Sequence, residues 1–470
     1  MSLLFAEKGC EGYCYDISRE NMDSAEKTIK DVEKQDRVVR KNGYKGLCSN
    51  AQSKDHPGVI IFSHPHGVPG DKCVGVRPYI TNGDVILDCQ NKYHVNTERR
   101  HKKAHRRQHL LCGMRCFRRL SKRTSWSIHV SWRRPRSIEN LDAVSEDRPG
   151  GPVHYMKIVH NGIKQGMMSV ISQVWYILTK GLELSDEEAA SVFEKWNHSH
   201  ELFSTFLIYI TVDINRTKDL EGHYVLGRIQ DKVVQDFDNT EGTGTWSCEE
   251  AVRLHVPAAT ILSAHLFRCS SAELNKRVAG EKASGHRIQP TAMKVESKDD
   301  FMEDLRKSTS FCFLLCFTQG LQIIREMDQQ RDWKINYPEL LQVWGAGSII
   351  QAGGIMKLLR QVYSQPDSQK NNLLSNIELA KELASIFPFL KRSVIAALQP
   401  DMLIPAMSQS MEFYNYSTSV GLPTQLTEAE LGYFGYHKFN LKEEHKGEPI
   451  KGMHHFEWKP AKGASDKSRL

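Results

Sequence analysis

The chain has 470 residues, which at roughly 150 residues per domain allows two or three domains. Hydrophobic residues make up 40% and charged residues 25%, and no apolar run approaches the roughly 18 residues of a membrane span. Eleven cysteines without a C-x2-C pair favour a reduced intracellular protein and predict no metal site. This composition excludes a membrane-spanning protein and favours an ordinary globular one.

The positive net charge comes from a single stretch. Residues 99–136 contain fourteen Lys/Arg and no Asp/Glu, so the rest of the chain has 63 − 14 = 49 basic against 56 acidic residues. Trp126, Trp132 and Phe117 lie between these cations, as backbone contact and base stacking in a nucleic-acid-binding arm require. A reading-frame change, argued below, explains the same composition, and we expect no nucleic-acid partner.

In chain order, the first hundred residues alternate between strand and helix patterns. Short apolar runs bounded by turn residues predict strands, and polar-apolar periodicity predicts helices, the first capped by Ser18 or Asn21. The predicted strands are 12–16, 59–62, 83–88 and 109–112, and the predicted helices are 21–33 and 97–108. This alternation predicts a parallel sheet with crossover helices.

From about residue 151 the pattern becomes almost entirely helical. The predicted helices are 152–180, 185–196, 201–216, 246–277, 298–330, 337–361 and 371–397. The tail after Phe439 is polar and rich in lysine, and we expect it to be flexible.

A polar stripe lies in the first of these helices. Lys157, His160, Asn161 and Lys164 follow the spacing i, i+3, i+4 and i+7, which puts them on one helix face. Such a stripe either lines a site or is a solvated face, and spacing alone favours the solvated face.

Three other features carry polar groups that could bind a ligand. The loop Gly242–Thr245 can present amides and hydroxyls to a phosphate at the start of the next helix, or can simply be a helix entry. Arg268 in an apolar helix is either a buried phosphate clamp or half of a structural ion pair. His437 follows Tyr433–Tyr436, an aromatic turn that can dock a tail.

Several segments, in order, resemble the decarboxylating 6-phosphogluconate dehydrogenase family. The resemblance runs through most of residues 150–440 and is weaker before them. Its main motifs are 154–163, 193–197, 206–211, 242–246, 267–272, 304–306, 336–337, 344–350 and 433–437, with 86–91 and 97–100 in the first part.

The resemblance implies an α/β Rossmann-like domain followed by a mostly all-α domain, in a homodimer. The implied boundaries are 1–112 for an incomplete NADP-binding domain, 113–150 for an aberrant basic segment, 151–440 for a helical substrate and dimerisation domain, and 441–470 for the tail. The implied reaction oxidises 6-phosphogluconate at C3 with NADP and releases CO2 to give ribulose 5-phosphate.

The resemblance also implies residue roles. Lys157 would take the C3 hydroxyl proton, because burial favours the neutral amine that such a base needs. Asn91 would lie near both nicotinamide and substrate. Four further residues would bind substrate: His160 and Asn161 by hydrogen bonds, Arg268 at the phosphate, and His437 from the tail of the partner subunit.

The chain departs from the family at several of these positions. Lys164 replaces the glutamate that protonates C1, and Gln165 replaces a phosphate-binding tyrosine. Thr245 stands where many members have a phosphate-binding lysine, and Leu431 where they have an arginine. The Gly-rich dinucleotide turn is missing, and Ile17 or Ser18 occupies the position of an arginine for the NADP 2′-phosphate.

Residues 113–136 differ most, because two Gly-rich substrate loops of the family are replaced there. Possible codons for Met114–Arg119 and Trp126–Arg133, read one base later, restore Cys-Gly-Val-Ser-Gly and Gly-Pro-Ser-Met-Ser-Pro-Gly. We therefore hypothesise a frameshift across 113–136, which also explains the basic run.

These departures leave two functional hypotheses open. The chain is either an NADP-linked oxidative decarboxylase with impaired turnover or an inactive member that acts as a helical dimer or binding module. We expect a cytoplasmic location, and the terminal Ser468-Arg469-Leu470 resembles a peroxisomal address as the alternative.

Overall fold

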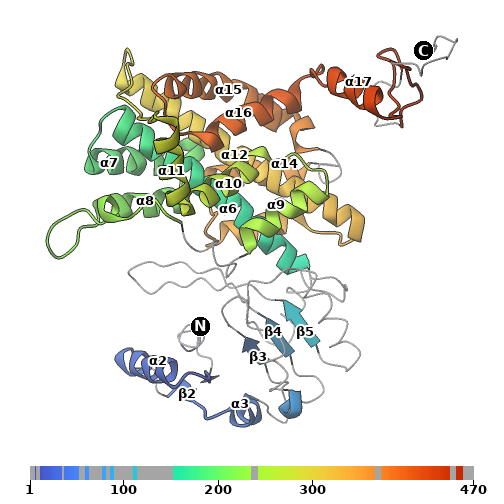
Figure 1. Cartoon of the computed structure of the whole chain (residues 1–470). Coiled ribbons are helices and arrows are strands. Elements are labelled where there is room, and N and C mark those ends of the chain that lie inside the picture. The colour runs from blue at the N-terminus through green and yellow to red at the C-terminus, as the bar shows by residue number, and fades with distance from the viewer. Residues whose placement is uncertain are drawn as a thin grey trace. The chain divides into compact units, whose positions relative to one another are not determined.

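The structure is a computed structural model that describes residues 6, 11–33, 36–51, 59–62, 77–80, 85–88, 110–113, 152–233, 242–365, 372–444 and 451–458. The chain divides into two compact units, residues 1–413 and 414–470 (Figure 1). Among the described helices, none is long and apolar enough to cross a membrane. The basic segment after residue 113, the helix predicted at 97–108 and the last twelve residues lie outside the described part.

The first strands are all parallel. β1 (Gly12–Cys14) pairs with β2 (Val38–Arg40), and β3 (Val59–Phe62), β4 (Val85–Asp88) and β5 (Leu110–Gly113) form a second sheet in that order. The helices and turns here are α2 (Arg19–Asp31), α3 (Tyr44–Ala51) and η2 (Arg77–Tyr79). The predicted parallel α/β character is confirmed, while β2 and α3 were not predicted.

Helix α2 shows why the chain folds this way locally. The Ser18 hydroxyl accepts a hydrogen bond from the Asn21 amide at 3.3 Å, so Ser18 is the predicted cap. One face of α2 buries Met22 and Ile29, and Ile29 packs with Val38 of the following strand. The unit β1–α2–β2 is therefore a small crossover connection between parallel strands.

Helices dominate from residue 152 onward, as predicted. They are α6 (Pro152–Tyr176), η4 (Ile177–Gly181), α7 (Asp186–Asn197), η5 (His200–Leu202), α8 (Phe206–Arg216), η6 (Leu226–Arg228), α9 (Thr243–Arg253), α10 (Ala259–Ala272), α11 (Leu274–Ser284), α12 (Lys298–Arg331), α13 (Tyr337–Gly345), α14 (Gly353–Ser364), η7 (Leu373–Ser375), α15 (Ile377–Leu398), α16 (Pro405–Thr418) and α17 (Gln425–Phe434).

Several predicted helices are wrong in their continuity. The predicted helix 201–216 is η5 and α8 with a break between them, and 371–397 is η7 followed by α15. The segment 246–277 is broken twice. Pro257, which has no amide proton and disfavours helical geometry in the residue before it, lies in the break between α9 and α10, and α10 and α11 meet at Glu273. The segment 337–361 is two helices, with Gly347 at φ = 133° in the break between them. Helices α16 and α17 were not predicted.

Helix α6 is the centre of the bundle, in contact with α9, α10 and α12 (Figure 1). Its crossing with α12 is very close, because a Cβ on Gly320 would lie 2.4 Å from Cγ1 of Ile163. Only glycine fits at position 320, so the axes of α6 and α12 approach more closely than a larger residue there would permit. The crossing fixes α6 from one side.

The unit of residues 414–470 contains α17 and a polar turn. Phe439 and His454 form an antiparallel bridge, and His454 Nε2 lies 2.9 Å from the Glu444 carboxylate. Residues 441–444 and 451–458 of the predicted flexible tail are described in this arrangement.

Candidate active site

The polar stripe of α6 faces the interior of the bundle. Lys157 is 9% exposed, His160 is fully buried and Asn161 is 4% exposed. The solvated-face interpretation, which spacing alone favoured, is wrong. A helix buried on nearly all sides still carries a lysine, an imidazole and an amide, and burying such groups costs free energy unless they interact with one another or with a ligand.

These three side chains contact each other in sequence. Lys157 Nζ lies 3.4 Å from His160 Nδ1, and the same nitrogen lies 3.3 Å from Asn161 Oδ1. The ring of Trp344, on α13, stands edge-on to the His160 ring with centroids 5.8 Å apart. The imidazole is therefore fixed between an amine, an amide and an indole. Such a row can accept a proton from a hydroxyl and orient the oxygens of a polyol.

The next turn of α6 brings in the N-terminus of α9. Gln165 is 6% exposed, and a Cβ on Gly244 would lie 2.6 Å from its amide oxygen and nitrogen. Gly244 therefore allows the Gln165 amide to lie directly against the first turn of α9. Lys164, one residue earlier, is half-buried.

The loop Gly242–Thr245 forms the N-terminus of α9, which agrees with both the phosphate and the plain helix-entry interpretations. Gly242 caps the helix without a side-chain bond, and Thr245 is exposed at its third position. The first-turn amides of a helix have no partner in its own ladder and favour an anion.

Helix α10 lies beside this turn and carries Arg268. His265 Nε2 lies 3.5 Å from Thr245 Oγ1, which places the two helices in polar contact. Arg268 is half-buried, so the expectation of a buried clamp is only partly right. It lines a surface depression of about 330 Å³ together with Val233, Leu266, Cys269, Ser270, Ala272 and Glu273.

Two expected site residues cannot be placed beside these. Asn91 lies outside the described residues. His437 is exposed in the unit of residues 414–470, where its carbonyl accepts a hydrogen bond from His455 Nδ1 at 3.1 Å. The structure thus brings together Lys157, His160 and Asn161 on α6, and Gln165 with the start of α9.

Comparison with known proteins explains this arrangement. Residues 153–458 match the model of the 6-phosphogluconate dehydrogenase C-terminal domain. The chain belongs to the 6-phosphogluconate dehydrogenase family. Its members are NADP-dependent decarboxylating dehydrogenases.

Relatives from this family match the chain over nearly its whole length. The decarboxylating enzyme of Emericella nidulans is 31% identical over 98% of this chain and 99% of its own. The corresponding values for enzyme 2 of Arabidopsis thaliana are 30%, 97% and 94%. The solved structure of Plasmodium falciparum 6-phosphogluconate dehydrogenase has the same fold, with a TM-score of 0.80, 24% identity and 97% coverage of both chains.

Two contacts of the site were not found in the sequence. Trp344 lay in a recognised motif, but nothing marked it as the neighbour of His160. His265 is a single histidine in an apolar helix, a pattern that usually indicates a core residue. Its one signal was the three-residue spacing to Arg268, which puts both on the same face of α10.

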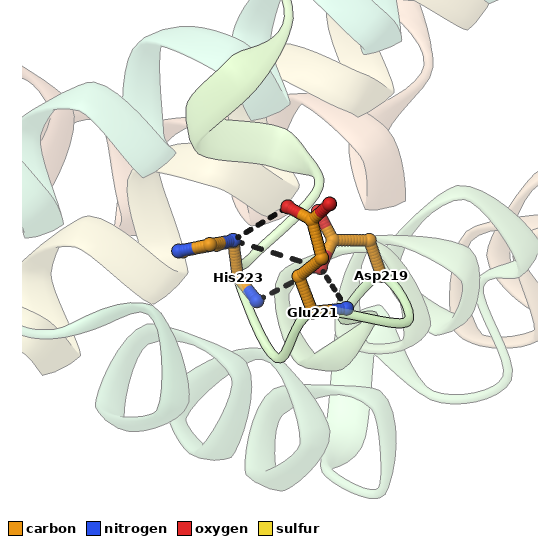
Figure 2. A group of neighbouring side chains, drawn as sticks. All are labelled: Asp219, Glu221 and His223. Carbon is orange, nitrogen blue, oxygen red and sulfur yellow. Dashed lines mark hydrogen bonds and ion pairs between the residues drawn. The ribbon is translucent and has the colours of Figure 1, made fainter.

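A separate group of potential metal ligands lies in the loop after α8. Figure 2 shows Asp219, Glu221 and His223 converging, with one ligand atom from each within 4.8 Å of the others. The Asp219 carboxylate instead accepts the backbone amides of Glu221 at 2.9 Å and His223 at 3.0 Å. These amides, with that of His223 first, hold the pKa of Asp219 below its ordinary value. Arg228 pairs with both carboxylates, so the cluster already has a cation.

Proposed function

We propose that this chain oxidises 6-phosphogluconate at C3 with NADP and releases CO2, giving ribulose 5-phosphate. The observation that supports it best is the buried contact series from Lys157 through His160 to Asn161. A lysine held at 9% exposure next to an imidazole is suited to accept a hydroxyl proton.

The chemistry of the α6 residues follows from their positions. Lys157 Nζ takes the proton of the C3 hydroxyl while hydride leaves C3, and the resulting ketone accepts the electron pair when CO2 departs. His160 and Asn161 hydrogen-bond the hydroxyls and keep C3 in line with the amine. Lys164 then donates a proton to C1 of the enediol, because it holds the position of the acid.

Residues for NADP are present near the first strand. In crossover nucleotide domains the adenosine ribose meets the turn after a strand. Here Ser18 and Arg19 begin α2 directly after β1, and Arg19 is exposed. Asp16 accepts hydrogen bonds from the Ser18 amide at 2.8 Å and the Asn21 side chain at 3.3 Å, so its carboxylate is engaged within the turn. Arg19, exposed at the start of α2, is the cation that would hold a 2′-phosphate, and the bound nucleotide would supply the hydride acceptor.

A second candidate function is that of an inactive member that works as a helical dimer or binding module. Lys164 favours it, because an ammonium in place of a carboxylic acid adds like charge beside Lys157 and donates a proton less readily. Leu431 favours it too, because leucine cannot bind a phosphate.

The two candidates are separated by turnover. We expect the purified chain to form NADPH and CO2 from 6-phosphogluconate at a rate several orders of magnitude below that of an intact site, because loss of one transition-state contact can cost about 10²–10³-fold. Lys157→Met should abolish the remaining rate, and Lys180→Met, at an exposed position after α6, should not change it. No turnover above background, with a folded dimer, favours the binding module.

We also propose a homodimer. The unit of residues 414–470 exposes Tyr433, Phe434 and Tyr436 by 57%, 72% and 76%, a concentration of aromatic surface typical of an interface. A second copy of the chain is the partner expected from the family, with His437 completing its site. A single species with the mass of one chain in analytical ultracentrifugation would contradict the dimer.

A further inference from the structure

His265 is a buried imidazole that no role above requires. It is 9% exposed, and its Nε2 lies 3.5 Å from Thr245 Oγ1 and 3.7 Å from Cys269 Sγ. Cys269 is four residues further along α10, on the same face. One ring nitrogen therefore faces both a hydroxyl on α9 and a thiol on its own helix.

The hydroxyl it faces is the exposed side chain of the first turn of α9. A threonine hydroxyl has one proton to donate and two lone pairs, and it rotates to suit its surroundings. If a neighbouring N–H donates to the oxygen, one lone pair is used and the proton is directed elsewhere. An anion at this turn gains from that direction, because it needs a donor and not an acceptor.

We propose that His265 is a positioning residue that donates from Nε2 to Thr245 Oγ1 and so directs the Thr245 proton toward the substrate phosphate. This inference rests on the proposed function and adds that Thr245, together with Arg268, contacts the substrate phosphate. Arg268 follows His265 by three residues, so the orienting imidazole and the guanidinium belong to one turn of α10. A lysine ammonium can donate to a phosphate in any orientation. The neutral threonine hydroxyl needs the imidazole to direct its single proton toward the phosphate.

The test measures binding of 6-phosphogluconate by calorimetry and the split between KM and kcat. Thr245→Val and His265→Leu should each weaken binding about 10- to 100-fold, the value of one hydrogen bond to an anion. The double variant should bind no more weakly than Thr245→Val, because His265 acts only through that hydroxyl. His265→Gln, whose amide nitrogen occupies the place of Nε2, should restore binding to within about twofold. The losses in Thr245→Val and His265→Leu should appear in KM more than in kcat.

Matched controls isolate the phosphate. Cys269→Ala removes the other neighbour of Nε2 and should bind as the unchanged protein does. Gluconate, which has no phosphate, should bind all variants equally. If His265→Leu does not fold, His265→Asn replaces it, because its amide is polar but too short to reach Thr245.

Each result decides one claim. Additive losses in the double variant, or no loss in His265→Leu or His265→Asn, overturn the positioning role while the proposed function stands. Full binding by Thr245→Val overturns Thr245 as a phosphate ligand. Failure of the unchanged protein to bind 6-phosphogluconate at all overturns the proposed function itself.

Discussion

Lys157 and Lys164 lie seven residues apart on α6, so two amines occupy positions where the proposed chemistry needs one base and one acid. A carboxylic acid still carries a proton to donate near neutral pH only if its surroundings raise its pKa, whereas an ammonium holds its proton too firmly to be a good donor. The substitution at residue 164 therefore weakens the last step, protonation of C1, more than hydride transfer.

Lys164→Glu should therefore raise the rate of ribulose 5-phosphate formation, by about 10²-fold if protonation limits turnover. The ratio of NADPH to CO2 and to ribulose 5-phosphate, followed in single-turnover experiments, measures it. Lys180→Glu makes the same charge change at an exposed residue and should leave the rate alone. An equal gain in both variants would attribute the effect to net charge.

At the scale of elements, the crossing of α6 and α12 determines where the stripe lies. Gly320→Ala should destabilise the protein by about 1–3 kcal/mol, because its Cβ would overlap Ile163 Cγ1 at 2.4 Å. Gly280→Ala is the matched control, since no atom lies within 4 Å of a Cβ there and α11 gains helix propensity. Urea unfolding of both variants gives the two free energies, and equal values would contradict the close crossing.

A second packing element is an ion cluster between η5 and α12. Arg306, with a side chain 8% exposed, forms two 2.8 Å hydrogen bonds to Glu303 and one to Glu201. The Arg306 hydrogen bonds lower the pKa of Glu303. Burial raises the pKa of Glu201, but the Arg306 hydrogen bond and charge outweigh it, so the net pKa is also below the ordinary value.

These shifts give stability that is present above the ordinary carboxyl pKa and is lost as pH falls through the lowered values. Arg306→Leu should therefore cost about 1–3 kcal/mol above pH ~5, with a smaller difference from the unchanged protein in more acidic solution. Arg392→Leu removes a pair to Asp304 that is 54% exposed on the arginine side, and should cost under about 1 kcal/mol. Thermal unfolding as a function of pH measures both; a constant difference across pH would show that Arg306 acts only by packing.

The sequence predicts features that depend on neighbouring residues better than features that depend on packing between distant segments. The Ser18 cap and the parallel strands are local patterns and were predicted, while the break at Pro257 was overlooked within an apolar run that looked continuous. The burial of the α6 stripe depends on which helices surround it, and that is settled by packing between segments far apart in the chain. The contacts of His160 with Trp344 and of Thr245 with His265 are of the same kind.

For the whole molecule, the proposed exchange of His437 between subunits makes a sharp prediction. Lys157→Met and His437→Ala should each have little activity alone. After the two are unfolded together and refolded, about half of the dimers are mixed, and each has one complete site, so roughly a quarter of the original activity returns. If His437 acts within its own chain, mixing restores nothing.

The burial of residues 155–163 on every side of α6 has a consequence for hydrogen exchange. Their amide protons are both bonded within the helix and remote from solvent, so they should exchange with deuterium only when the whole bundle opens. Ligand binding would then slow all of them by one common factor, given by its stabilisation of the folded state. The first turn of α9 is exposed at Thr245 and would instead respond locally. The exchange rates of the two helices would thus report global stability and phosphate occupancy separately, in a single experiment.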